Sequence, residues 1–148
     1  MSIDIANETD FGVEQGVDEA ELASVARYVL DEMGIHPMAE LSVLLIDTAA
    51  MEQLHIQWMD EPGPTDVLSF PANGAKPKRG AANIGDIAIS PQTARRNARR
   101  YARSAPAELR ILILHGMLHL AGFDHETDHG EMDRKERRLR GQLGVATR

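Results

Sequence analysis

Cysteine is absent from this chain of 148 residues, and aromatic residues make up only 4% of it. Without cysteine no disulfide can form, and any bound metal must be held by histidine or carboxylate side chains. The scarcity of aromatic residues excludes a long base-stacking platform of the kind that dedicated single-strand binders use. No apolar run approaches the roughly 20 residues that a membrane span needs. The acidic stretch from Met1 to Asp10 lacks the features of a signal peptide. These absences predict a cytoplasmic protein with no membrane partner.

Charge is distributed unevenly along the chain, whose overall net charge is −7. Residues 1–66 contain 15 acidic residues and a single base, Arg27, for a net charge of −14. Residues 67–148 contain 15 basic and 8 acidic residues, for a net charge of +7. The basic part could contact a phosphate backbone, and uneven surface charge on an ordinary soluble protein explains the pattern about equally well.

The spacing of apolar residues predicts five helices and three strands. The helices are expected over residues 17–33, 48–58, 91–103, 106–121 and 130–143, and the strands over residues 41–46, 65–70 and 84–89. Thr48 is expected to cap the second helix, and Ser90 and Pro91 to form the N-cap and first position of the third. The fourth helix is almost wholly apolar from Ile111 to Ala121, so it should be central and buried.

These elements predict one α+β domain over residues 1–148, in which a small mixed sheet packs with about five α-helices. The length and a hydrophobic content of 43% suit a single core. Residues 1–15 are expected to be a flexible N-terminus. A candidate metal site lies at the end of the buried central helix.

Three histidines form that candidate site. His115 and His119 are four residues apart, so on a helix both imidazoles project from one face. Gly122 can adopt the left-handed conformation that ends a helix, and the returning chain could bring His125 to complete a three-nitrogen face. Three protein ligands with an open fourth position are typical of a catalytic zinc.

Two other interpretations of the histidines were weighed. Ordinary histidines inside an apolar helix would leave polar atoms unpaired, at about 1–3 kcal/mol each, which disfavours that interpretation. The spacing is also that of metzincin proteases, which place a glutamate general base directly after the first histidine. This chain has Gly116 there, and that absence argues against peptide hydrolysis. A helical glycine costs about 1 kcal/mol relative to alanine. A glycine at this position would be explained by the close approach of another backbone or of a substrate, or equally by helix packing.

The eleven residues 115–125, HGMLHLAGFDH, match the signature H-G-x-L-H-L-x-G-[YF]-D-H throughout. Residues 64–71, PTDVLSFP, and residues 85–87, GDI, follow the same pattern in order and separation. In these blocks the chain resembles the YbeY family of bacterial endoribonucleases, metal-dependent enzymes of ribosomal RNA maturation and ribosome quality control. The resemblance covers roughly residues 40–143.

The resemblance implies a zinc-dependent endoribonuclease that binds one Zn²⁺, or another divalent metal, through His115, His119 and His125. It implies single-stranded RNA, ribosomal RNA and the small ribosomal subunit as partners, with the 3′ end of 16S ribosomal RNA as the target and no DNA. Ser69 and Asp86 fall in matched blocks and are expected to hold strands in place.

One position departs from the family. Many members have an arginine a few residues before the P-T-D segment, where this chain has Met59. Other bases would have to neutralise phosphate, and the candidates for RNA binding are Arg95, Arg96, Arg99, Arg100, Arg103, Lys76, Lys78 and Arg79. The arginines could equally be the solvated face of a helix.

Asp124, next to His125, is the nearest carboxylate. We expect it to orient a ligand histidine by accepting a hydrogen bond from the ring nitrogen that does not bind metal. It could instead act as a base or cap a turn. Whether water or the ribose 2′-hydroxyl attacks is left open by the residues. The alternatives to an endoribonuclease are a metallopeptidase-like hydrolase, a hydrolase of small phosphoesters, and a non-catalytic ribosome assembly factor with a structural metal.

Overall fold

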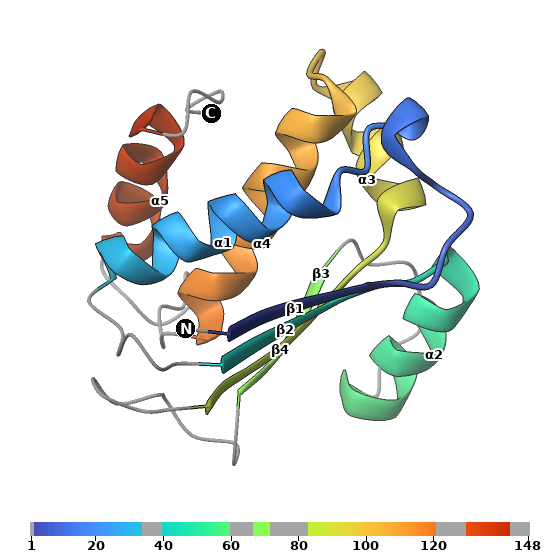
Figure 1. The fold of residues 1–148 in the computed structure, drawn as a ribbon, viewed down its shortest axis with the longest axis horizontal. Coiled ribbons are helices and arrows are strands. Elements are labelled where there is room, and N and C mark those ends of the chain that lie inside the picture. Colours follow the sequence, from blue (N-terminus) through green and yellow to red (C-terminus); the bar gives the residue numbers. More distant parts are fainter. Residues whose placement is uncertain (1, 34–39, 60–66, 72–82, 121–129, 143–148) are drawn as a thin grey trace.

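The computed structural model describes the whole chain except residues 1, 34–39, 60–66, 72–82, 121–129 and 143–148. Figure 1 shows a four-stranded sheet with helices on both of its faces. In chain order the elements are β1 (Ser2–Asn7), a 3-10 helix (Val13–Gln15), α1 (Glu19–Glu32), β2 (Glu40–Leu45), α2 (Thr48–Met59), β3 (Val67–Pro71), β4 (Asn83–Ile89), α3 (Pro91–Arg100), α4 (Ala105–Leu120) and α5 (Glu131–Gln142). The predicted α+β class, with a small mixed sheet and five α-helices, is confirmed.

The sheet has the strand order β1-β2-β4-β3. The first three strands are parallel, and β3 runs antiparallel to β4 at the opposite edge from β1. The expected flexible N-terminus is wrong for Ser2–Asn7, since this segment pairs along its length with β2. Ile3 and Ile5 alternate with polar neighbours and pack against the core, which is the period-two pattern of an edge strand.

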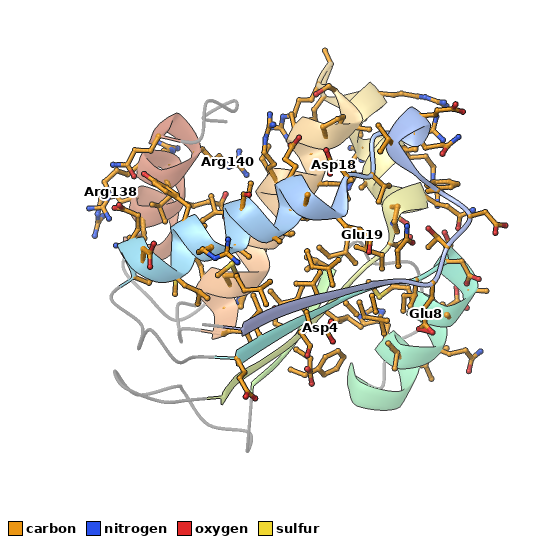
Figure 2. The ribbon with its side chains drawn as sticks, in the orientation of Figure 1. Asp4, Glu8, Asp18, Glu19, Arg138 and Arg140 are labelled. Atoms are coloured by element: carbon orange, nitrogen blue, oxygen red, sulfur yellow. The ribbon has the colours of Figure 1, made fainter. Side chains whose placement is uncertain are left out.

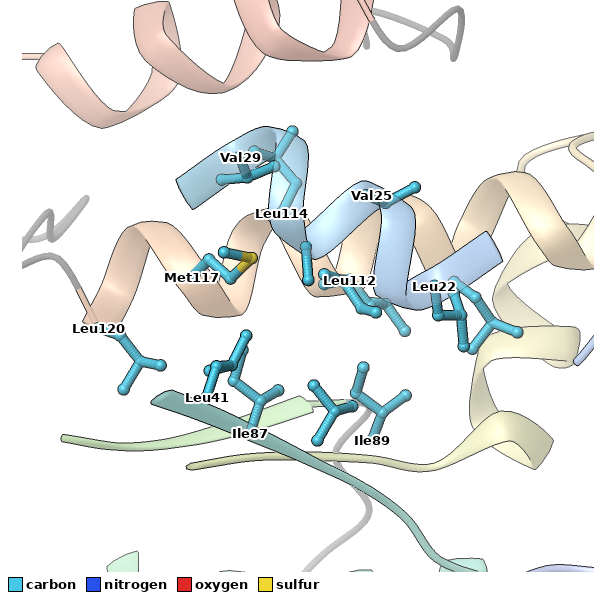
Figure 3. Packing of buried hydrophobic residues seen from close by; sticks show 14 of the residues in the cluster. Leu22, Val25, Val29, Leu41, Ile87, Ile89, Leu112, Leu114, Met117 and Leu120 are labelled. Carbon is cyan, nitrogen blue, oxygen red and sulfur yellow. The ribbon is translucent and has the colours of Figure 1, made fainter. Parts of the chain in front are cut away.

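Helices α1 and α4 cover one face of the sheet, and α2 covers the other (Figure 1). Alternate residues of β4 serve the two faces: Ile87 and Ile89 join the larger core, whereas Ala88 joins the smaller cluster beneath α2. Figure 3 shows Leu120 of α4 together with Leu41 and Ile87 in the space between α4 and the strands. Because α4 is enclosed on nearly all sides, its apolar residues follow no single stripe, as the sequence predicted for a central helix.

Capping residues account for several helix boundaries. Ser90 accepts a hydrogen bond from the Thr93 N–H, and Pro91 follows at the first helical position, so the predicted start of α3 is confirmed. At α2 the cap is Asp47 instead of Thr48, because the Asp47 carboxylate accepts from the Ala50 N–H at 2.8 Å.

Helix α3 ends at Arg100, three residues earlier than predicted. Ala102 has a φ of 56°, which is incompatible with continuing the helix. Tyr101, directly after the helix, is 53% exposed. No helix within the described residues is long and apolar enough to cross a membrane.

Candidate metal centre

His115 and His119 lie one turn apart on the last two turns of α4. Their Nε2 atoms are 3.0 Å apart, and their ring centroids are 4.6 Å apart with nearly perpendicular planes. The predicted convergence of these two imidazoles is therefore present. Around them α4 is buried, but the His115 side chain keeps 28% of its surface exposed. A pair of this kind at a partly open helix end can share a ligand that reaches it from solvent.

Gly116, between the two histidines, packs closely against the sheet. A Cβ atom at this position would lie 3.1 Å from Cγ2 and 3.3 Å from Cδ1 of Ile87, and 3.3 Å from Oγ of Ser69. The Ser69 hydroxyl also donates a 3.0 Å hydrogen bond to the Gly116 carbonyl. Of the reasons considered for a glycine here, packing of the helix on β3 and β4 is the one observed. Ser69 thus holds the helix, and with it the histidines, against the sheet.

Glu136 of α5 is a part of the site that the sequence analysis missed. Its Oε1 lies 2.7 Å from Nδ1 of His115, and its Oε2 lies 2.6 Å from Nη2 of Arg140. Both side chains of the ion pair are largely buried, at 10% and 12% exposure. Figure 2 shows Arg140 on the side of α5 that faces α4, whereas Arg138 points outward. Glu136 thus makes the kind of contact with His115 that was expected of Asp124, which lies outside the described residues.

The i, i+4 spacing of Glu136 and Arg140 was visible in the sequence as a helix-surface ion pair. Nothing in the spacing indicated that this pair faces inward. Leu139 lies on the same side of α5 as Glu136 and Arg140 and is fully buried in the main core, so this side of α5 packs on α4. Only the packing of α5 on α4 therefore identifies Glu136 as part of the site.

The chemistry of the histidine pair fits a zinc ion. Two nitrogens at about 2.1 Å from a tetrahedral zinc would be about 3.4 Å apart, close to the observed Nε2 separation. Within the described residues, no group of three or more potential ligands is assembled. The third predicted ligand, His125, lies outside those residues, as do Asp124, Lys76, Lys78 and Arg79. The side chain of Met59, at the end of α2, is likewise not described.

The arginines of α3 lie far from the histidines. Helix α3 packs beside the N-terminal part of α4 (Figure 1). At about 1.5 Å per residue, His119 is about 21 Å further along the α4 axis than Ala105. Arg96, Arg99 and Arg100 are exposed. The exposed arginines of the predicted stripe therefore form a basic surface that is separate from His115 and His119.

Members of the predicted stripe also make contacts within the fold. Arg103 forms a 2.9 Å ion pair with Glu108 and retains 12% side-chain exposure, so it is not part of an exposed stripe. Its guanidinium also lies 5.1 Å from the ring centre of Tyr101. Arg95 lies over the ring of Phe11 at 5.2 Å. Arg103 thus stabilises the junction between α3 and α4.

Asp86, from the matched G-D-I block, is exposed on β4 and pairs in register with Phe70 of β3. It lies in the sheet, as expected, and no described contact links it to the histidines. The described site therefore consists of the two histidines, Glu136 with Arg140, and Ser69 beneath the helix.

Comparison with known proteins places this site in a family. A family model described as endoribonuclease YbeY matches residues 4–144. The endoribonuclease YbeY of Kineococcus radiotolerans is 46% identical over 146 residues, covering 94% of this chain and 84% of the relative. That of Acidothermus cellulolyticus is 44% identical over 165 residues, covering 97% and 98% of the two chains.

The fold has a known counterpart as well. The solution structure of TM1509 from Thermotoga maritima matches with a TM-score of 0.64 at 26% identity, covering 96% of this chain and 91% of that one. The family match starts at residue 4, within β1, and so extends beyond residues 40–143 on which the resemblance was drawn. The resemblance is confirmed, and this chain belongs to the YbeY endoribonuclease family.

Proposed function

We propose that this chain is an endoribonuclease that cleaves single-stranded RNA with one zinc ion held by His115, His119 and His125. The observation that carries the proposal is the convergence of the His115 and His119 Nε2 atoms to 3.0 Å in a chain whose relatives are named endoribonucleases. Three imidazoles suit zinc, and another divalent metal in the same site would leave the reaction class unchanged. When bound, such an ion supplies Lewis-acid polarisation of a phosphodiester.

The protein's own residues orient and hold the site. Glu136 accepts the hydrogen bond of His115, and Ser69 holds the turn that carries both histidines against the sheet. Asp124 is kept as a candidate for a similar role beside His125. Preorganised groups of this kind contribute to catalysis because little reorganisation is needed when charge develops on the substrate.

The RNA backbone is proposed to follow the basic surface of Arg95, Arg96, Arg99 and Arg100 on α3, with Lys76, Lys78 and Arg79 as further candidates. Because α3 packs beside the N-terminal part of α4, whereas the histidines lie near the C-terminal end of α4, this surface would hold RNA away from the cleaved bond. Such contacts strengthen binding without acting on the reacting phosphate, and they weaken as salt is raised. Arg103 is left out of the surface because Glu108 pairs with it.

Within this proposal, the substrate is ribosomal RNA on the small ribosomal subunit, at the 3′ end of 16S ribosomal RNA, in the cytoplasm. DNA and membranes are not expected partners. The shared features of the family support this assignment, and the basic surface on α3 is compatible with a folded RNA-protein particle as well as with free RNA.

A cleavage assay with a matched histidine control tests the proposal. Labelled single-stranded RNA is incubated with the wild type, with His119→Ala and with His55→Ala, each with and without a chelator. His55 lies on α2, across the sheet from the site, so its variant controls for loss of an unrelated histidine and for contaminating nucleases. Cleavage that is lost with the chelator and in His119→Ala, but kept in His55→Ala, is the expected result.

Other results would redirect the assignment. Intact RNA in every lane, with zinc bound by the wild type, would indicate a non-catalytic assembly factor with a structural metal. Cleavage of a peptide digest under zinc would indicate a metallopeptidase. Equal RNA cleavage by the wild type and His119→Ala would refute the proposed site.

A further inference from the structure

Glu136 is a buried carboxylate that lies outside the matched histidine motif yet contacts its first ligand. We propose that Glu136 is a positioning residue: it holds His115 in the tautomer protonated at Nδ1, so that the lone pair of Nε2 is directed at the metal. Arg140, in turn, holds Glu136 in place. The inference rests on the proposed function only in naming the metal, and part of its test requires no metal.

The direction of the hydrogen bond follows from the chemistry of the partners. An ionised carboxylate can only accept hydrogen bonds, and Oε2 of Glu136 already accepts from the guanidinium of Arg140 at 2.6 Å. The Nδ1 atom of His115, 2.7 Å from Oε1, must then be the donor. A neutral imidazole protonated at Nδ1 leaves Nε2 unprotonated, and Nε2 is the atom that faces His119.

The geometry of α5 makes this arrangement rigid. Glu136 and Arg140 are one turn apart and both largely buried, and Leu139 beside them is fully buried. A side chain fixed at both oxygens has little freedom to rotate, so the His115 ring is held in one orientation. Partners of this kind, when removed from a metal site, typically cost 10–100-fold in metal affinity.

A purely structural role is the competing explanation, since Glu136 also ties α5 to α4. Glu108 provides a matched control, because it is a buried carboxylate on α4 that pairs with an arginine, Arg103, and touches no histidine in any described contact. Glu136→Gln and Glu108→Gln each replace a buried, arginine-paired carboxylate by its neutral amide. If Glu136 were only structural, the two variants would behave alike toward zinc.

Zinc affinity is measured for the three proteins by competition with a chromophoric chelator, at a temperature where each is folded. We expect Glu136→Gln to bind zinc about 10–100-fold more weakly than the wild type, and Glu108→Gln to bind within about twofold of it. Equal affinities of Glu136→Gln and the wild type, or equal losses in both variants, would overturn the proposal. If Glu136→Gln fails to fold, Arg140→Gln takes its place, because this variant keeps Glu136 beside His115 but removes the guanidinium that holds Glu136 in place. We expect Arg140→Gln to bind zinc several-fold more weakly than the wild type.

The second measurement uses the metal-free protein. Imidazole ¹⁵N chemical shifts, recorded where both rings are neutral, distinguish the two tautomers of each histidine. We expect the Nδ1–H form for His115 in the wild type and a mixture of the two tautomers of His115 in Glu136→Gln. An Nε2–H form of His115 in the wild type would refute the assignment. If the wild type bound no zinc, the proposed function would fail, and the tautomer result would still decide the role of Glu136.

Discussion

Replacing Gly116 with alanine tests how closely α4 must approach the sheet. In an open helix this change would stabilise the fold by up to about 1 kcal/mol, because alanine has the higher helix propensity. Here the new methyl would meet Cγ2 of Ile87 at 3.1 Å, and Ile87 is fully buried in the core. Overpacking of this kind costs about 1–3 kcal/mol. We therefore expect a net loss of up to about 2 kcal/mol.

Gly141 on α5 provides the matched control. It is exposed, and a Cβ atom built there has no heavy atom within 4 Å. Gly141→Ala should leave stability unchanged or raise it by up to about 1 kcal/mol. Urea unfolding of the wild type and both variants gives the comparison, and the difference between the two alanine variants, about 1–3 kcal/mol, isolates the packing cost. Gly116→Ala as stable as Gly141→Ala would refute the close-packing argument.

A second substitution locates the clash. Ile87→Val removes Cδ1, one of the two Ile87 atoms within 3.4 Å of the added methyl. Combined with Gly116→Ala, it should cost less than the sum of the two single changes, because each relieves part of the other. A strictly additive double variant would mean that Cδ1 of Ile87 does not limit the approach, and would leave Cγ2 of Ile87 and Oγ of Ser69 as the limiting contacts. Zinc affinity measured on the same proteins would show how far a shift of this turn disturbs the histidines on either side of it.

Three further predictions concern residues away from the histidines. Asp18→Ala removes the side chain that accepts from two backbone N–H groups at the start of α1, and should cost about 1 kcal/mol in urea unfolding; an unchanged midpoint would contradict the cap. Arg103→Ala leaves Glu108 buried without its ion pair, so it should lower the free energy of unfolding by roughly 3–5 kcal/mol and leave RNA affinity unchanged. Arg99→Ala should change the free energy of unfolding by less than about 0.5 kcal/mol and should weaken RNA binding at low salt. If Arg103→Ala instead weakened RNA binding without loss of stability, and Arg99→Ala destabilised the fold, the roles given to both arginines would be wrong. Burial lowers the pKa of Lys135 in the folded protein below 10.5, so at pH values between that lowered pKa and 10.5 Lys135 is protonated more in the unfolded chain than in the folded one. The stability of the wild type relative to Lys135→Gln should therefore rise with pH in this range. A stability difference between the two proteins that does not change across alkaline pH would contradict this.

The N-terminal strand shows where a prediction from sequence failed. Residues 1–15 were expected to be flexible, although Ile3 and Ile5 already alternate with polar residues as in a strand. What makes β1 a strand is its parallel pairing with β2, whose residues come almost 40 positions later. A segment this short has too little local preference to specify its own structure, and a partner distant in sequence decides it.

The arginines of α3 show a similar limit. The sequence places five of them within nine residues, as an apparent stripe. Helix α3 ends at Arg100, and the next turn of chain brings Arg103 inward to Glu108. The i, i+4 pattern predicts which residues share a face only while the helix continues, so the end of the helix changed the assignment.

The sequence by itself determined the elements whose pattern is local: the five α-helices, the start of α3 at Ser90 and Pro91, and the His115 and His119 pair, since one helical turn brings residues four apart together. The family was recognisable from contiguous residues for the same reason. Only the tertiary structure decided that Glu136 faces His115, because the two residues lie on different helices and their 2.7 Å contact depends on how α5 packs on α4. Contacts between elements are set by the shape and burial of whole surfaces, which no spacing along the chain encodes.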